Sequence, residues 1–166
     1  MVFRTYHPGP PLGDFVDLLW LYEGFARPAH ERERLLPDGS VEVVFNLAED
    51  KIRLYDRENT DKFRTFHGSI VSGPHTQFFV IDTAEQDVVA GIHFKPGGAY
   101  PFLKMPSDEL HNQHVGLEEI WGRWQVWCAS SCLQRSLPRR GCGFWNAGCG
   151  WRPGERWDVI PRWRLL

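Results

Sequence analysis

The 166-residue sequence contains no hydrophobic run that approaches the roughly 20 residues of a membrane-spanning helix. Residues 1–11 lack the basic start and the apolar stretch of a secretory signal. The net charge of −2 provides no general attraction for nucleic acid. We therefore expect a cytoplasmic protein that contacts no membrane.

Histidine, methionine and lysine are all missing after residue 122. Residues 1–122 hold 11 Lys and Arg against 19 Asp and Glu, a net charge of −8, whereas residues 123–166 hold eight Arg and two acids, a net charge of +6. All four cysteines and six of the eight tryptophans also lie in this last segment. So abrupt a change in composition predicts a domain over residues 1–122 and a separate, disordered tail over residues 123–166.

Alternating apolar and polar residues in the first segment predict several short strands. We expect strands at residues 41–47, 52–55, 63–66, 70–71, 78–81 and 88–94, with residues 52–55 paired to residues 63–66. Residues 14–22 have the apolar spacing of a short helix, with a strand beginning near Leu19 as the competing interpretation, and residues 99–104 predict a helical turn. Short strands separated by turns indicate a mainly β fold with short helices, a cupin-like β-barrel or sandwich.

The residues that carry chemistry do not form a known catalytic pattern. No two of the seven histidines stand two residues apart, as in a cupin metal site, and no second pair accompanies His111 and His114. Ser69, Ser72 and His75 occur without a Gly-x-Ser-x-Gly elbow, so turn chemistry explains them better than hydrolysis does. The cysteine spacings fit no zinc site. We expect no enzyme, no metal and no cofactor.

Two features suggest a ligand site. The segment containing Lys95, Gly97 and Gly98 could hold an anion through backbone N–H groups, although the simpler interpretation is a turn from a strand into a helix. On the preceding strand His93 points opposite Ile92 and Phe94, and it is a ligand-contact candidate if its face lines a barrel interior. We take His93, Lys95, Gly97 and Gly98 as the candidate ligand-binding residues.

The motifs of residues 6–122 resemble the N-terminal domain of a branch of AraC-type transcriptional regulators. The matching segments are Tyr-His-Pro-x-x-Pro-Leu at residues 6–12, Leu-Pro-Asp-Gly at 36–39, Ser-Gly-Pro-His at 72–75, Gly-Ile-His-Phe-Lys-Pro-Gly-Gly-Ala at 91–99 and Leu-x-x-Ile-Trp-Gly at 117–122. The resemblance implies a sensing or dimerisation module without catalysis, with DNA binding by a separate C-terminal helix-turn-helix domain. Nothing after residue 122 resembles that DNA-binding domain.

The tail has the composition of GC-rich DNA translated out of frame, because Trp, Cys, Arg and Gly have GC-rich codons. We back-translated the tail with chosen synonymous codons and read the DNA one base earlier, from the Trp127 codon. The resulting hypothetical sequence contains no Trp or Cys and has helix-like runs. We therefore expect a frameshift near Gly122. The competing interpretation is an authentic Trp- and Arg-rich tail that binds single-stranded nucleic acid or anionic lipid.

Together these observations predict the regulatory domain of an AraC-like regulator, truncated before its helix-turn-helix domain. The expected partners are a small-molecule effector and a second copy in a homodimer, with DNA contacted only through the missing domain. The alternative is a stand-alone cupin-like protein that binds, or acts on, a small molecule.

Overall fold

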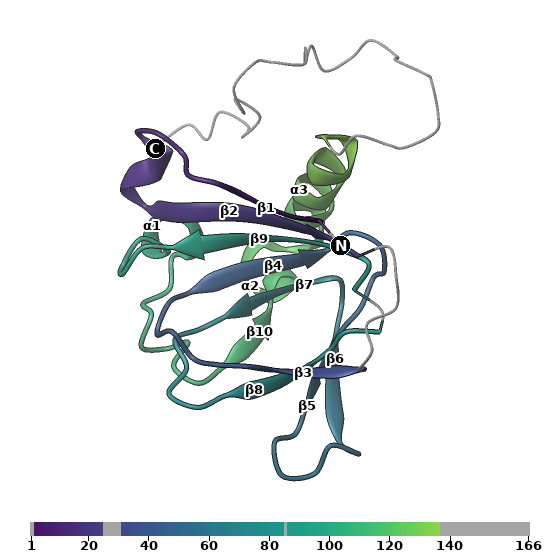
Figure 1. The fold of residues 1–166 in the computed structure, drawn as a ribbon. Helices are drawn as coiled ribbons and strands as arrows, with labels where there is room; N and C mark the ends of the chain where they lie inside the picture. Colours follow the sequence, from purple (N-terminus) through teal and green to yellow (C-terminus); the bar gives the residue numbers. More distant parts are fainter. Residues whose placement is uncertain (1, 25–30, 85, 137–166) are drawn as a thin grey trace, which may run out of the picture.

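The computed structural model describes residues 2–24, 31–84 and 86–136, which form two antiparallel sheets with short helices (Figure 1). The larger sheet has six strands, which are, in spatial order, β1 (Val2–Tyr6), β2 (Val16–Glu23), β9 (Val88–Phe94), β4 (Glu42–Asn46), β7 (Ser69–Ser72) and β10 (His114–Gly116). The smaller sheet has the order β3 (Arg32–Leu35), β8 (Phe79–Asp82), β5 (Ile52–Tyr55) and β6 (Phe63–Phe66). The predicted mainly β class with short helices is confirmed. Within the described residues the strands form two sheets and no closed barrel.

The described residues form few helices. They are η1, a 3-10 turn (Leu12–Asp14), α1 (Tyr100–Leu103), α2 (Leu117–Trp121) and α3 (Arg123–Ser136). Strand β10 leads into α2 without a loop, because Gly116 is both the last residue of the strand and the N-cap of the helix. The side chain of Glu119 accepts a hydrogen bond from the Gly116 N–H at 3.2 Å and so fixes this junction. No helix in the described part of the chain is long and apolar enough to cross a membrane.

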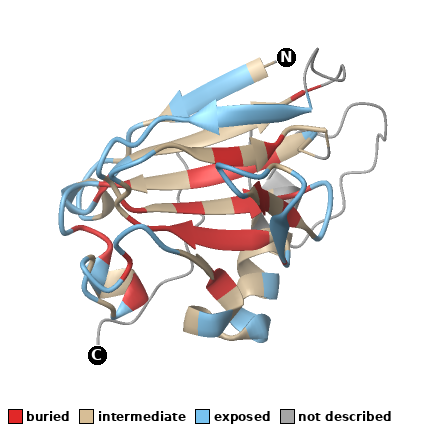
Figure 2. Ribbon diagram, turned by 90° about the horizontal axis from the view of Figure 1, so that it is seen from below, coloured by how far each residue is buried: buried red, intermediate tan, exposed pale blue. Residues whose placement is uncertain are grey.

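Two apolar clusters hold the layers together. The first lies between the large sheet and the helices and includes Val43, Phe45 and Phe94, with Leu103 of α1 and Leu117 of α2. The second lies between the two sheets and joins side chains of β5 to side chains of β4 and β7; its members are Ile52, Leu54, Phe66 and Ile70, with Val44, Phe79 and Ile81 at its margin. Figure 2 shows the buried residues concentrated in the central strands of the large sheet.

Several predicted strands are confirmed. Residues 42–46, 52–55, 63–66, 69–72, 79–82 and 88–94 are all strands, and β5 pairs with β6 in the register that places Ile52 opposite Phe66. The predicted helical turn at residues 99–104 is α1. The face of β9 that carries Val88, Ala90, Ile92 and Phe94 packs against the helix-side cluster.

The helix predicted at residues 14–22 is wrong, because Val16–Glu23 form strand β2. This strand is hydrogen-bonded to a neighbour on each side, with Trp20 opposite Thr5 of β1 and Gly91 of β9. Because side chains on both faces of β2 are half-buried, the apolar residues are continuous, and in a short segment a continuous run cannot be distinguished from helical spacing.

The predicted tail over residues 123–166 is described by the structure only as far as residue 136. Residues 123–136, for which disorder was expected, form α3, and Val126, Ala129 and Leu133 pack from it against the helix-side cluster. Their spacing of three and four residues places them on one helix face. Residues 137–166, with two of the four cysteines and four of the tryptophans of the predicted out-of-frame tail, lie outside the described residues.

Candidate functional site

A row of polar side chains crosses the large sheet on the face that looks toward the small sheet. Cross-strand pairing places His93 of β9 opposite Glu42 of β4, Glu42 opposite Ser72 of β7, and Ser72 opposite His114 of β10. Two residues along the same strands, Val44 and Ile70 belong to the apolar cluster between the sheets. Since side chains alternate along a strand, the polar row shares that face. We call these four residues the polar row.

The His93 end of the polar row is a network of hydrogen bonds and carboxylates. Trp20 donates its indole N–H to Glu42 Oε1 at 2.6 Å, and His93 Nδ1 lies 3.8 Å from the same oxygen. The Ser40 hydroxyl lies 3.4 Å from His93 Nδ1 but donates to Asp38 Oδ1 at 2.6 Å. Burial raises the pKa of the Glu42 carboxyl, and the hydrogen bond from Trp20 opposes that rise.

The His114 end contains two stacked imidazoles. The rings of His75 and His114 have centroids 4.3 Å apart at an interplanar angle of 28°, and Phe79 contacts both rings, with its centroid 4.8 Å and 4.6 Å away. Ser72 Oγ lies 3.3 Å from His114 Nε2. The Nε2 atom of His75 is buried and has no hydrogen-bond partner among the described residues.

Both imidazoles are held in the neutral form. Burial, and after it the nearby His75 and Arg64, lower the pKa of His114 to about 3. Burial also lowers the pKa of His75, with smaller contributions from His111 and Arg57. At neutral pH the two rings therefore present planar surfaces and uncharged nitrogen atoms.

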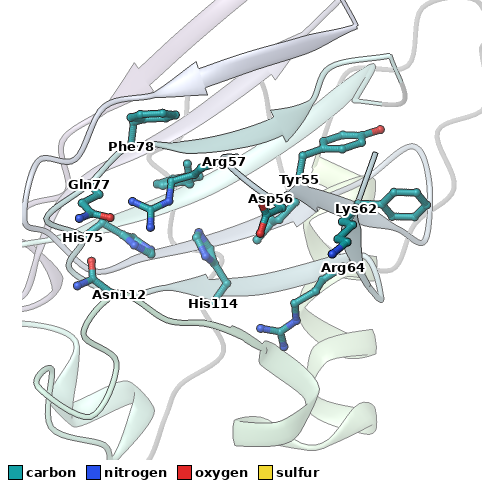
Figure 3. A pocket seen from close by; sticks show the side chains of 13 residues that line it. Tyr55, Asp56, Arg57, Lys62, Arg64, His75, Gln77, Phe78, Asn112 and His114 are labelled. Atoms are coloured by element: carbon teal, nitrogen blue, oxygen red, sulfur yellow. The ribbon is translucent and has the colours of Figure 1, made fainter. Parts of the chain in front are cut away.

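A cavity of about 450 Å³ opens beside these rings (Figure 3). The hairpin of β5 and β6 forms one side of it, and the segments before β8 and β10 form the other. Its charged lining residues are Asp56, Arg57, Lys62 and Arg64; the uncharged ones are Leu54, Tyr55, Phe63, His75, Gln77, Phe78, Phe79, Asn112 and His114. A cavity of this size, with aromatic walls and a few polar groups, is typical of a small-molecule site.

The residues predicted from the sequence lie elsewhere. His93 belongs to the polar row, at the opposite end from His114, and it does not line the cavity. Lys95 donates from Nζ to the carbonyl oxygen of Gly13, and Gly98 donates its N–H to the Lys95 oxygen at 2.8 Å. Gly97 adopts a φ of +75°, as a turn requires, and the helix that follows has only four residues. The segment 95–98 is thus a turn against the residues around Gly13.

Sequence reasoning missed the residues that line the cavity. His75 follows β7 and His114 begins β10, so only the antiparallel pairing of these strands brings the two rings together. Arg57 lies in the polar hairpin loop between β5 and β6, which carries no motif, and Arg64 lies in β6. His75 and His114 were considered in the sequence as residues of a hydrolase and of a metal site and were set aside, and the resemblance segment at residues 72–75 also contains Ser72 and His75.

Candidate metal ligands do not cluster in the described part of the chain. No group of three or more His, Cys, Asp or Glu side chains there is arranged to hold a metal ion.

Residues 4–116 match a protein family that is described as "Domain of unknown function (DUF6597)". A comparison with curated proteins found no match, and a comparison with solved structures found none either.

Proposed function

This chain belongs to the DUF6597 family, and we propose that its β domain is the small-molecule-sensing module of an AraC-like transcriptional regulator. The observation that carries the proposal is the cavity beside His75 and His114. It combines aromatic walls with charged and polar side chains. A few polar groups set among aromatic walls are what a small-molecule site provides.

The arrangement favours binding over catalysis. A serine nucleophile needs a base that accepts its proton and a third group that orients the base. Near His93 the Ser40 hydroxyl donates to Asp38 instead, and Asp38 does not orient the imidazole from its far side. Near the cavity, His114 contacts Ser72, but both histidines are kept neutral by burial and have no carboxylate partner within 4.0 Å among the described residues. We therefore propose a ligand that is bound and released unchanged.

The regulatory part of the proposal rests on the resemblance of residues 6–122 to N-terminal domains of AraC-type regulators. Two facing antiparallel sheets suit the cupin-like architecture that this resemblance implies. In such regulators the DNA is contacted by a separate helix-turn-helix domain. The direct passage from β10 into α2 supports a sensing role, because it places a cavity residue three positions from a helix start.

A homodimer is a second part of the proposal. Among the described strands β1 is an edge strand of the large sheet, and Phe3 on it is 60% exposed. Such an edge presents unpaired backbone groups that a second copy can pair with. Sedimentation of the full chain over a range of concentrations tests this, and a monomer at every concentration contradicts it.

The sensing role is tested by a thermal-shift screen of the full chain against neutral and charged metabolites. We expect at least one chemical class to raise the melting temperature saturably and to be recovered unchanged. Phe63→Ala should abolish the shift, whereas Phe3→Ala should keep it, because both rings are exposed but only Phe63 lines the cavity. A ligand recovered in converted form would favour the alternative, a stand-alone cupin-like enzyme. A shift that survives Phe63→Ala would contradict the site.

A further inference from the structure

The wall of the cavity is positively charged although the protein as a whole is slightly acidic. Three cationic side chains, Arg57, Lys62 and Arg64, line the cavity together with one carboxylate, Asp56, in a chain whose net charge is −2. That carboxylate already accepts hydrogen bonds at Oδ1 from the backbone N–H groups of Glu58 and Asn59, at 2.9 and 2.8 Å. Asp56 therefore serves the hairpin turn and offsets only one of the three positive charges.

The three cations have no ion-pair partner in the part of the chain that the structure describes. No carboxylate oxygen there lies within 4.0 Å of the charged nitrogen atoms of Arg57, Lys62 or Arg64. Arg64 is placed by stacking, with its Cζ atom 4.8 Å from the centre of the Phe66 ring. A guanidinium held by its face still offers N–H groups along its edge, and these match a carboxylate.

The cations line the same cavity as the stacked histidines. Figure 3 shows the side chains of Arg57 and Arg64 on different sides of the His75 and His114 rings. Because these rings are uncharged, they add no positive charge of their own, and they supply flat surfaces together with Phe79.

We propose that the cavity binds a small organic anion with a planar ring, an aromatic carboxylate. The positive charges of Arg57, Lys62 and Arg64 attract its carboxylate, and its ring lies against Phe79 and the paired histidines. This inference rests on the proposed sensing function and specifies the ligand class of that site. Charge recognition requires the anion, and the aromatic wall requires the ring, so neither part alone accounts for the lining.

The test compares probes that differ in one property. Benzoate and phenylacetate carry both ring and charge, benzamide carries the ring alone, and acetate and inorganic phosphate carry charge alone. Calorimetric titration of the full chain should show saturable binding of at least one aromatic carboxylate. We expect benzamide and acetate to bind at least about tenfold more weakly than the aromatic carboxylates, because benzamide lacks the charge-assisted contact and acetate lacks the ring contacts. Equal binding of benzamide, or stronger binding of phosphate, would overturn the proposal.

Matched arginine variants locate the site. Arg57→Gln and Arg64→Gln should each weaken carboxylate binding by about tenfold. Arg4→Gln should leave it unchanged, because Arg4 lies on β1, at the opposite edge of the large sheet from β10. Circular dichroism melts verify that each variant is folded. A second readout is the NMR chemical shifts of the His75 and His114 rings at neutral pH, which a bound carboxylate should change in the wild type only.

The outcomes separate this inference from the function on which it rests. If the metabolite screen finds a neutral ligand that needs Phe63, the sensing function stands and the anion proposal fails. If neither aromatic carboxylate binds to the folded chain at millimolar concentration, the anion proposal also fails. If carboxylate binding survives both arginine variants, the anion binds at another place, and the assignment to this cavity is wrong.

Discussion

His75 and His114 stack face to face, with ring centroids 4.3 Å apart, although 38 residues separate them in the sequence. The pairing of β7 with β10 brings their segments together, and burial keeps the His114 imidazole uncharged. A stacked pair of imidazoles tolerates two neutral rings and disfavours two charged ones, because like charges repel at this distance. The contact therefore makes the stability of the domain sensitive to pH.

We predict that acid destabilises the protein through His114. Its pKa is about 3 in the folded protein, against about 6.5 in an unfolded chain. Between these two pH values the unfolded chain binds more protons than the folded protein does. The contribution of a neutral His114 to the free energy of unfolding is therefore complete above about pH 6.5 and is lost as the pH falls toward about 3. His114→Gln should remove on the order of 2–4 kcal/mol of the pH dependence measured by urea unfolding. An unchanged slope between wild type and variant would show that His114 does not titrate in this way.

We predict that Gly91→Ala destabilises the large sheet. A Cβ atom at position 91 would lie 2.2 Å from Cε2 of Trp20, so the indole would have to leave its place and its hydrogen bond to Glu42. The expected loss of unfolding free energy is about 1–3 kcal/mol, as for other overpacked sites. Gly9→Ala is the control, because no atom lies within 4 Å of a Cβ there. Equal stability of the two variants would contradict the close packing of Trp20.

We predict that Asp82 contributes more stability than an exposed carboxylate does. Its carboxylate is buried, lies 3.4 Å from Arg53 Nη1 and accepts the Ala84 N–H at 2.8 Å. Asp82→Ala should cost about 2–4 kcal/mol, because the partners lose a buried acceptor. Asp50→Ala, which removes a carboxylate whose side chain is 84% exposed, should cost about 1 kcal/mol or less. Denaturant unfolding of both variants measures the difference, and comparable costs would refute it.

We predict that shortening the chain to residue 136 preserves a cooperative melt, and that shortening it to residue 122 gives a cooperative but less stable domain. The second deletion removes Val126, Ala129 and Leu133, which are partly buried against the helix-side cluster. Losing these contacts should cost about 2–4 kcal/mol. Thermal unfolding compares the two lengths. A melt that loses its cooperativity at residue 122 would make α3 part of the obligate core and would move the domain boundary.

Features that depend on neighbouring residues were predicted from the sequence, whereas features that depend on contacts between distant residues were not. Strands β4, β5, β6 and β9 were predicted because alternation along a few residues reports which face is buried. Strand β2 was not, because half-burial on both faces removes the alternation, and β3 was missed because all four of its residues are exposed. Burial on both faces or on neither leaves no period to detect, and the fully buried β7 was predicted instead from two apolar residues that lie between turn residues.

The candidate site depended on contacts that no local pattern contains. His93 was identified as a residue of a strand face, and the structure places it in the polar row. Lys95, Gly97 and Gly98 were candidates because their segment resembles an anion loop, whereas the close approach of Gly98 to Phe15 explains the second glycine structurally. The cavity itself is assembled from a hairpin loop, a turn and the start of a strand, and their proximity follows only from the topology.

Because Gly116 both ends β10 and caps α2, the strand and the helix form one continuous segment. The strand β10 begins at His114 beside the cavity, and the helix α2 begins at Leu117, which is fully buried against the large sheet. With no connecting loop between them, His114 and the start of α2 are held at a fixed spacing of three residues. The helix α3 begins two residues after α2 ends at Trp121, so the chain runs from the wall of the cavity to α3 with only Gly122 between the helices.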